Sequence, residues 1–197
     1  MTINASTGAI TLPSGFELNR SSEIEALRAS GLCAPHDIYN PGTPWYYHRF
    51  SDGDFEGHKL GFSVCFYQSQ RSPKSVLTTC SFGASPWNKE NAPPEWSLDV
   101  DAQQLELNLH VLKNLLGQPH QMKKNCQDWK DFPVLRNCAV YNFSWGGVWC
   151  GSEDPKTSQV NSSIFLAYAD NQKWAHDDYK RSAPVRLMKS WWERWKR

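Results

Sequence analysis

Polar and hydrophobic positions alternate along part of the first half of the chain, a pattern typical of strands that bury one face. Residues His58 to Tyr67 (HKLGFSVCFY) show it most clearly, because large hydrophobic side chains occupy every second position from Leu60 to Phe66. The flanking segments Trp45 to Phe50 and Ser75 to Phe82 are rich in aromatic and β-branched residues, which favour strands. Turn residues separate the three segments, so the pattern predicts an antiparallel meander.

A second strand region lies in the last third of the chain. In residues 139–145, three aromatic side chains fall on one side of an alternating segment. Gly146-Gly147 predicts a two-residue hairpin turn into Val148–Cys150, and Ser163 to Tyr168 predicts a closing strand. The polar residues 152–161 predict the loop between them.

Three segments carry the signals of helices. The clearest is 101–116, where four leucines form one stripe and Asp101 and Gln104 match a capping box. A short helix is predicted at 21–29 and a basic, Trp-rich helix at about 184–197.

The order of these elements indicates the fold class. A short helix, a meander, a long helix and a second hairpin set follow one another without the strict β-α-β alternation of a parallel sheet. We therefore predict a single α+β domain over residues 1–197. Its sheet should be mostly antiparallel, with the helices packed on one face.

Charge is unevenly distributed, although the formal net charge of the 197 residues is only +1. From Lys180 onward there are seven basic residues and one acid, whereas residues 1–179 contain 14 basic and 19 acidic residues. An acidic body lacks the clustered Lys and Arg that bind phosphates. It therefore fits a basic protein partner better than a nucleic acid.

Location and redox state follow from what surrounds the termini and the cysteines. The first residues lack the regions of a secretory signal, and no apolar run is long enough to span a membrane. We therefore expect a cytoplasmic protein with no membrane partner. The six cysteines include no C-x-x-C pair for zinc, and those at 65, 80 and 150 lie among strand-like apolar residues. We expect reduced, buried thiols.

No common catalytic or cofactor motif occurs in the sequence. The phosphate-binding loops GxxxxGK[ST] and GxGxxG, the GxSxG elbow and the HExxH zinc motif are all missing. The alternating acids Asp52, Asp54 and Glu56 resemble part of a calcium loop, but the glutamate at its twelfth position is missing. We therefore predict no catalytic residue, no bound metal and no cofactor.

Several segments resemble small bacterial immunity proteins, which neutralise toxins delivered by cell contact or by type VI secretion. GAITLPSGFELN with the short helix after it resembles their opening, and HKLGFSVCFY with SVLTTCSF resembles their central strand pair. LKNLLGQP, YNFSWGGVW and SSIFLAY are similar to their later half, so the resemblance covers most of residues 8–170. It implies a protein that binds one cognate toxin and blocks the active cleft of that toxin. It assigns no role to any residue, because these families use different surfaces.

Contact residues are instead suggested by charge and aromatic content. An acidic surface suits a toxin with a basic contact surface, and Trp and Tyr are frequent in binding hot spots. The candidates are three groups of residues. They are the acids Asp52, Asp54 and Glu56 at the tip of the first predicted hairpin, the acids Glu153 and Asp154 of the predicted 152–161 loop, and Trp145 and Trp149 of the second predicted hairpin. For both tryptophans, a position in the core is favoured over contact with a partner, because most large aromatic side chains are buried.

Two other classes of function stay open. The basic 184–197 segment could act as a nucleic-acid or membrane-surface adaptor, or it could dock on the sheet through its apolar stripe. A small enzyme of unfamiliar type would instead show a deep polar pocket with converging acids or a Cys–His pair.

Overall fold

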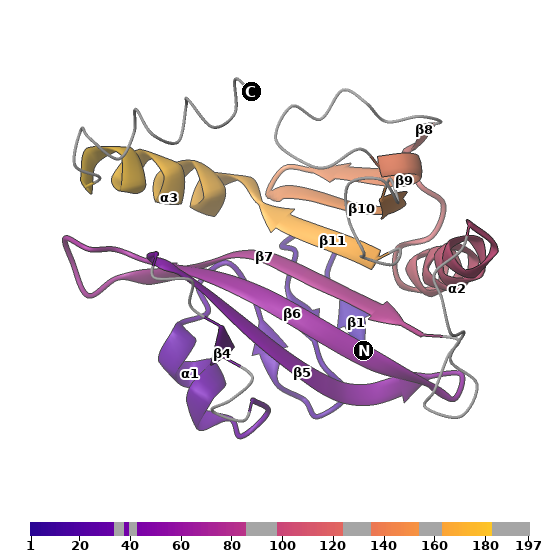
Figure 1. Ribbon diagram of the computed structural model, residues 1–197, viewed down its shortest axis with the longest axis horizontal. Coiled ribbons are helices and arrows are strands. Elements are labelled where there is room, and N and C mark those ends of the chain that lie inside the picture. The colour runs from indigo at the N-terminus through magenta and orange to yellow at the C-terminus, as the bar shows by residue number, and fades with distance from the viewer. Residues whose placement is uncertain (34–37, 40–42, 86–97, 124–134, 154–162, 183–197) are drawn as a thin grey trace.

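A large antiparallel sheet dominates the computed structural model, which describes residues 1–33, 38–39, 43–85, 98–123, 135–153 and 163–182 (Figure 1). Eight strands form it in the order β4-β5-β6-β7-β11-β10-β9-β8. They are β4 (Ile38–Tyr39), β5 (Trp45–Phe55), β6 (His58–Gln68), β7 (Ser75–Ala84), β8 (Gln121–Lys123), β9 (Leu135–Phe143), β10 (Gly146–Glu153) and β11 (Ser163–Tyr168). The predicted meander is β5 to β7, and antiparallel pairing of β7 with β11 joins it to the second strand set. The predicted α+β class is confirmed.

A small sheet and three helices complete the described structure. The small sheet contains β1 (Thr2–Ile3), β2 (Ile10–Thr11) and β3 (Glu17–Leu18), paired in that order. The helices are α1 (Ile24–Ala29), α2 (Leu98–Leu116) and α3 (Ala169–Ser182). The structure thus has a helix after β11 that the sequence pattern did not predict, and the helix predicted at about 184–197 lies outside the described residues.

The main hydrophobic core lies on one face of the large sheet. The alternating side chains of β6 that the sequence pattern singled out belong to it, together with residues of the small sheet, α1 and α2. Its fully buried members include Ile10, Leu18, Leu27, Leu60, Phe66, Leu112 and Leu166. Burial of this apolar surface is the dominant favourable term in folding, and it fixes the small sheet against the large one.

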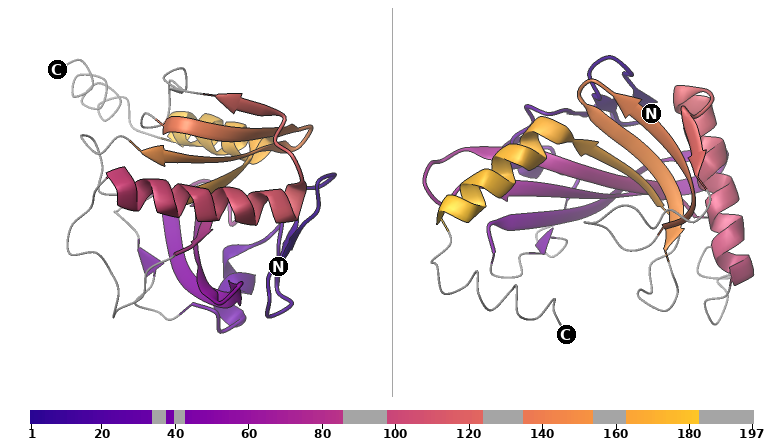
Figure 2. Two further views of the ribbon diagram at one scale, coloured as in Figure 1. Left: turned by 90° about the vertical axis from the view of Figure 1, so that its right-hand side faces the viewer. Right: turned by 90° about the horizontal axis from the view of Figure 1, so that it is seen from above.

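Helix α3 packs on the other face of the large sheet (Figure 2). Tyr67 and Val76 follow and precede core residues in sequence, so their side chains point to the opposite side, where they cluster with Ala175 of α3. The Tyr67 hydroxyl donates a hydrogen bond of 2.9 Å to Asp178. The expected placement of helices on one face therefore holds for α1 and α2 but not for α3.

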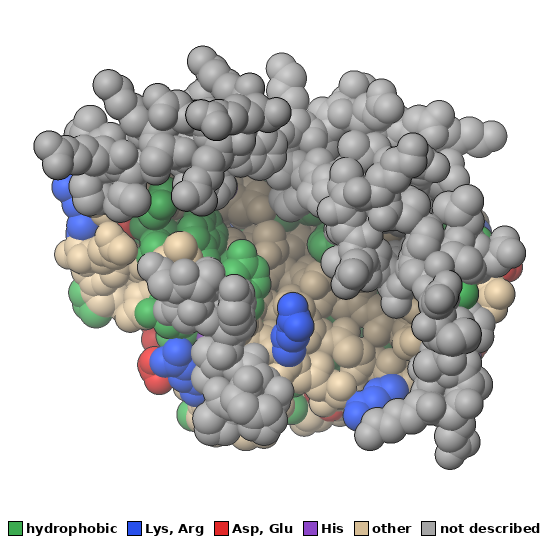
Figure 3. All heavy atoms as spheres, in the orientation of Figure 1, with side chains coloured by type: hydrophobic (Ala, Val, Ile, Leu, Met, Phe, Trp, Pro, Cys, Tyr) green, Lys and Arg blue, Asp and Glu red, His purple; other side chains and the backbone are tan. Residues whose placement is uncertain are grey.

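The middle of this second face consists of small residues. Gly61 pairs with Gly83, and Ser63 pairs with Ser81, across β6 and β7. From the same side as Figure 1, the part not covered by grey atoms is mostly backbone and uncharged polar side chains (Figure 3). Since the face offers little apolar surface there, α3 docks at its end, where aromatic side chains are available.

The hairpin between β9 and β10 turns two residues earlier than predicted. Its turn residues are Ser144 and Trp145, and Gly146 already belongs to β10. A Cβ on Gly146 would collide with the backbone carbonyl of Ala167 in β11. The glycine is therefore needed for the close approach of two strands and not for the turn.

Helix α2 begins before the predicted capping box. Gln104 lies inside the helix and is buried, so its predicted capping role is wrong. Its side-chain amide donates to the Ala84 carbonyl, and Asn108 accepts a hydrogen bond of 3.0 Å from the Ala84 backbone N–H. The two polar side chains thus provide hydrogen-bond partners for the backbone N–H and carbonyl of Ala84, the last residue of β7. This explains why they occupy the buried face of the helix.

The cysteines of the strands are buried, as predicted. Cys65, Cys80 and Cys150 all lie in the interior, and Cys65 and Cys80 are free thiols. Burial raises the pKa of the Cys80 thiol to about 12, so it stays protonated at neutral pH. Among the described helices, none combines the length and the apolar character needed to cross a membrane.

Candidate functional site

The predicted acidic tip comprises the end of β5, with Asp52 and Asp54, and the turn after it, with Glu56. It is attached to the small sheet on one side. Asp52 accepts two hydrogen bonds from Ser14, one of 3.1 Å from the backbone N–H and one of 2.6 Å from the hydroxyl. Ser14 lies in the turn between β2 and β3. The Asp52 carboxylate therefore joins the end of β5 to the β2–β3 turn, 38 residues away in the chain.

The other side of the tip is attached to α2. The Glu56 carboxylate lies 3.2 Å from Nε2 of His110, and the Phe55 ring contacts the same imidazole edge-on at 5.6 Å between ring centroids. Within the turn, Asp54 accepts a hydrogen bond of 3.2 Å from the Gly57 backbone N–H. Contacts from two elements thus hold the turn in one position.

The carboxylates of this tip differ in what they can offer a partner. Asp52 is only partly exposed and is used by Ser14, whereas Asp54 and Glu56 are exposed. Two exposed acids on a fixed turn can pair with Lys or Arg of another protein. In the part of the chain that the structure describes, no group of three or more His, Cys, Asp or Glu residues could hold a metal ion.

The other predicted contact residues are placed differently. Trp145 and Trp149 are buried, with 5% and 4% of their surface exposed, so they are poorly placed to contact a partner. Trp149 lies on the second face of the sheet, where its ring stacks on Phe165 at 5.8 Å. The Glu153 side chain and all of Asp154 lie outside the described residues.

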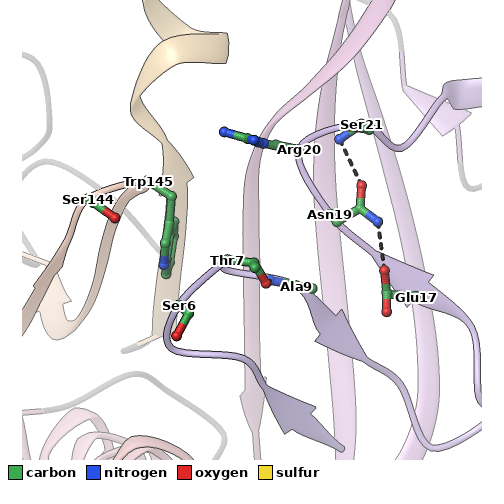
Figure 4. A pocket seen from close by; sticks show the side chains of 9 residues that line it. All are labelled: Ser6, Thr7, Ala9, Glu17, Asn19, Arg20, Ser21, Ser144 and Trp145. Carbon is green, nitrogen blue, oxygen red and sulfur yellow. Dashed lines mark hydrogen bonds between the residues drawn. The ribbon is translucent and has the colours of Figure 1, made fainter.

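A polar hollow next to Trp145 is the second candidate region, and the sequence analysis did not identify it (Figure 4). It has a volume of about 370 Å³ and lies between the N-terminal loop, the end of β3 and the β9–β10 turn. Its walls are formed by Ser6, Thr7, Ala9, Glu17, Asn19, Arg20, Ser21, Ser144 and Trp145. Residues 6–21 meet the distant residues 144–145 there, so no local spacing could have predicted it.

Trp145 holds the N-terminal loop, the residues 4–9 between β1 and β2, in place at this hollow. Its indole N–H donates a hydrogen bond of 2.8 Å to the Ala5 carbonyl, and its ring stacks on Phe143 at 5.0 Å. Gly8 lies directly against the indole, and the Gly8 carbonyl accepts a hydrogen bond of 2.8 Å from the Tyr168 hydroxyl. The loop is therefore a fixed wall, fastened to residues about 140 to 160 positions away.

The contact between Gly8 and Trp145 leads to a stability prediction with a matched control. Gly8 has a φ of 76°, and a Cβ there would come within 2.6 Å of the indole ring. Gly15 has a similar φ of 87° but open space around it. We expect Gly15→Ala to cost about 1 kcal/mol of unfolding free energy through backbone strain. Gly8→Ala should cost about 1–3 kcal/mol more, because it also overpacks the core.

Urea denaturation of the two alanine variants measures this difference. Equal losses for both would mean that the indole moves away from Gly8 at no cost. The close contact would then not fix the loop.

The β2–β3 hairpin connects the two candidate regions. Its turn supplies Ser14 to the acidic tip, and its open end supplies Ala9, Glu17 and Asn19 to the hollow. The tip and the hollow therefore lie at opposite ends of the same hairpin.

No family model, no curated protein and no solved structure matches this chain.

Proposed function

We propose that this protein is an immunity protein, which binds a cognate bacterial toxin in the cytoplasm and blocks the active cleft of that toxin. The observation that carries the proposal is the tip of the β5–β6 hairpin, where Asp54 and Glu56 are exposed and the hairpin contacts both the small sheet and α2. An element that is fixed before binding loses little conformational entropy on association. The resemblance of several segments to immunity proteins gives independent support.

The charge of the chain favours a toxin with a basic contact surface. Residues 1–179 carry 14 basic and 19 acidic side chains, a formal charge of 14 − 19 = −5. Charge complementarity raises association rates and suppresses wrong partners. The tip acids would then pair with Lys or Arg around the toxin's cleft, and binding would weaken as salt screens the pairs.

Co-expression with the toxin encoded by the neighbouring gene tests the proposal. We expect the wild-type chain to co-purify with that toxin in a one-to-one complex and to restore growth. The variant Asp54→Asn/Glu56→Gln should raise the dissociation constant about tenfold, because two exposed ion pairs contribute about 1.4 kcal/mol together. Titration calorimetry at low and high salt measures this change.

Glu23→Gln provides the matched control, since Glu23 is an exposed acid at the start of α1 whose side chain makes no capping hydrogen bond. It should leave the dissociation constant within about twofold. Absence of both co-purification and growth rescue would refute the immunity function. An equal loss in the control would show instead that overall charge, and not the tip, governs binding.

A further inference from the structure

We propose that the hollow next to Trp145 is a binding site for a carboxylate, with Arg20 as the residue that recognises it. The Arg20 side chain is exposed, and in Figure 4 it extends across the hollow toward Trp145. Among the described residues it makes no ion pair or side-chain hydrogen bond, whereas Arg28 and Lys74 each pack on an aromatic ring. A guanidinium presents a planar fork of N–H donors that matches a carboxylate.

Hydroxyl groups on other walls of the hollow add neutral hydrogen-bond donors. Ser6, Ser21 and Ser144 line the hollow, and no described hydrogen bond uses the hydroxyl of any of them. Each hydroxyl can donate one hydrogen bond to a carboxylate oxygen. The hollow therefore offers a charged donor and several neutral donors from three separate segments.

The backbone that carries these groups is fixed. The side-chain amide of Asn171 in α3 donates a hydrogen bond of 2.7 Å to the Arg20 carbonyl. The neighbouring Asn19 backbone N–H donates one of 2.8 Å to the Ser22 hydroxyl. On the opposite wall, the indole of Trp145 fastens the loop that contains Ser6. The backbone that carries the donors is thus in place before a ligand arrives, so binding needs to order only their side chains.

Glu17 gives the ligand an orientation. Its carboxylate also lines the hollow and accepts a hydrogen bond of 2.7 Å from the side-chain amide of Asn19. A pure anion close to Glu17 would be repelled, so the ligand carboxylate belongs at Arg20 and an N–H donor belongs toward Glu17. This arrangement suits an acidic amino-acid residue or a free acylated amino acid. A volume of about 370 Å³ is sufficient for a ligand of this size.

An NMR titration of the full chain tests the site with a defined probe. The probe is N-acetyl-L-glutamic acid α-amide, and the control ligand is the neutral glutamine analogue of the same shape. We expect saturable shifts of the Arg20 Nε–H and Trp145 indole N–H resonances, with a dissociation constant in the millimolar range that an open polar site allows. The glutamine analogue should bind at least about tenfold more weakly.

Two arginine variants separate the hollow from the rest of the surface. Arg20→Gln should weaken the binding of the probe at least about tenfold, whereas Arg49→Gln, at another exposed arginine on β5, should leave it unchanged. A shift that does not saturate, an equal response to the glutamine analogue or full binding by Arg20→Gln would each overturn the proposal. Dispersed indole resonances confirm that each variant is folded.

The same variants distinguish a carboxylate on a partner protein from a free small molecule. If Arg20→Gln also weakens toxin binding about tenfold, the carboxylate belongs to an Asp, a Glu or a C-terminus of the toxin. If toxin binding is unchanged while probe binding is lost, the site serves a free carboxylate. The probe titration needs no toxin, so it stands or falls independently of the immunity function.

Discussion

Trp145→Ala is expected to lower the free energy of unfolding by about 3–5 kcal/mol, the range for removing a large aromatic side chain from a core. The indole is 5% exposed and stacks on Phe143. Its ring also lies 5.7 Å from the ring of Tyr168, so alanine leaves a cavity between three elements. The variant also removes the hydrogen bond to the Ala5 carbonyl, which fastens the N-terminal loop. Urea denaturation followed by circular dichroism measures the loss.

Trp145→Phe is the matched control, because it keeps an aromatic ring but removes the N–H donor. It should cost less than the alanine variant, with about 1 kcal/mol of the loss due to the hydrogen bond and the remainder due to lost ring area. The pair also decides between the two roles that the sequence left open for Trp145. If Trp145→Ala retained its stability but lost toxin binding, the residue would be a contact residue and not part of the core.

The strands could be predicted from the sequence because their signal is local. In β6 every second residue from Leu60 to Phe66 belongs to the main core, and the period of two shows this without any knowledge of the partner strands. Helix α3 lacks such a signal, because Ala175 is its one fully buried residue and its other anchors are polar or half-buried. It is held by long-range contacts such as Tyr67 to Asp178, which only the folded chain brings together. Tertiary contacts thus override a weak helical pattern.

Pairing of distant polar residues likewise explains the errors in the details of α2. Gln104 fits a capping box by spacing, yet its side-chain amide donates a hydrogen bond to the Ala84 carbonyl at the end of β7. The acidic tip could be named from its sequence, but the sequence does not show that Asp52 is used by Ser14. Of the three acids, only Asp54 and Glu56 keep exposed carboxylates for a partner. The hollow could not be predicted from the sequence, because its polar residues form a site only when separate segments come together in the fold.

His48 makes the stability of the fold sensitive to mild acid. Its side chain is fully buried on the face of β5 that packs against the core, 6.0 Å from the ring of Phe66. Neither ring nitrogen has a hydrogen-bond partner among the described residues. Burial lowers the pKa of His48 below its ordinary value of 6.5, and the positive charge of Arg28 on α1 lowers it further. The Tyr46 backbone and Glu25 oppose this shift but are the smaller causes.

A depressed histidine pKa has a definite consequence for stability. Above pH 6.5 the imidazole is neutral in both states, so it adds no pH dependence. Below that value the unfolded chain binds a proton that the folded chain cannot accept, and stability falls by about 1.4 kcal/mol per pH unit until the folded pKa is reached. We therefore expect His48→Phe, which preserves the packing on Phe66, to reduce the slope of stability against pH by about one proton below pH 6.5.

The matched control is His176→Phe, because His176 is exposed on α3 and its ring contacts Trp45, a contact that phenylalanine can preserve. Urea midpoints of both variants and the wild type between pH 5 and 7.5 give the slopes, and the other histidines cancel in the comparison. The control should follow the wild type. If His48→Phe followed it as well, the imidazole would have to accept a proton in the folded state. That outcome would contradict the depressed pKa of His48.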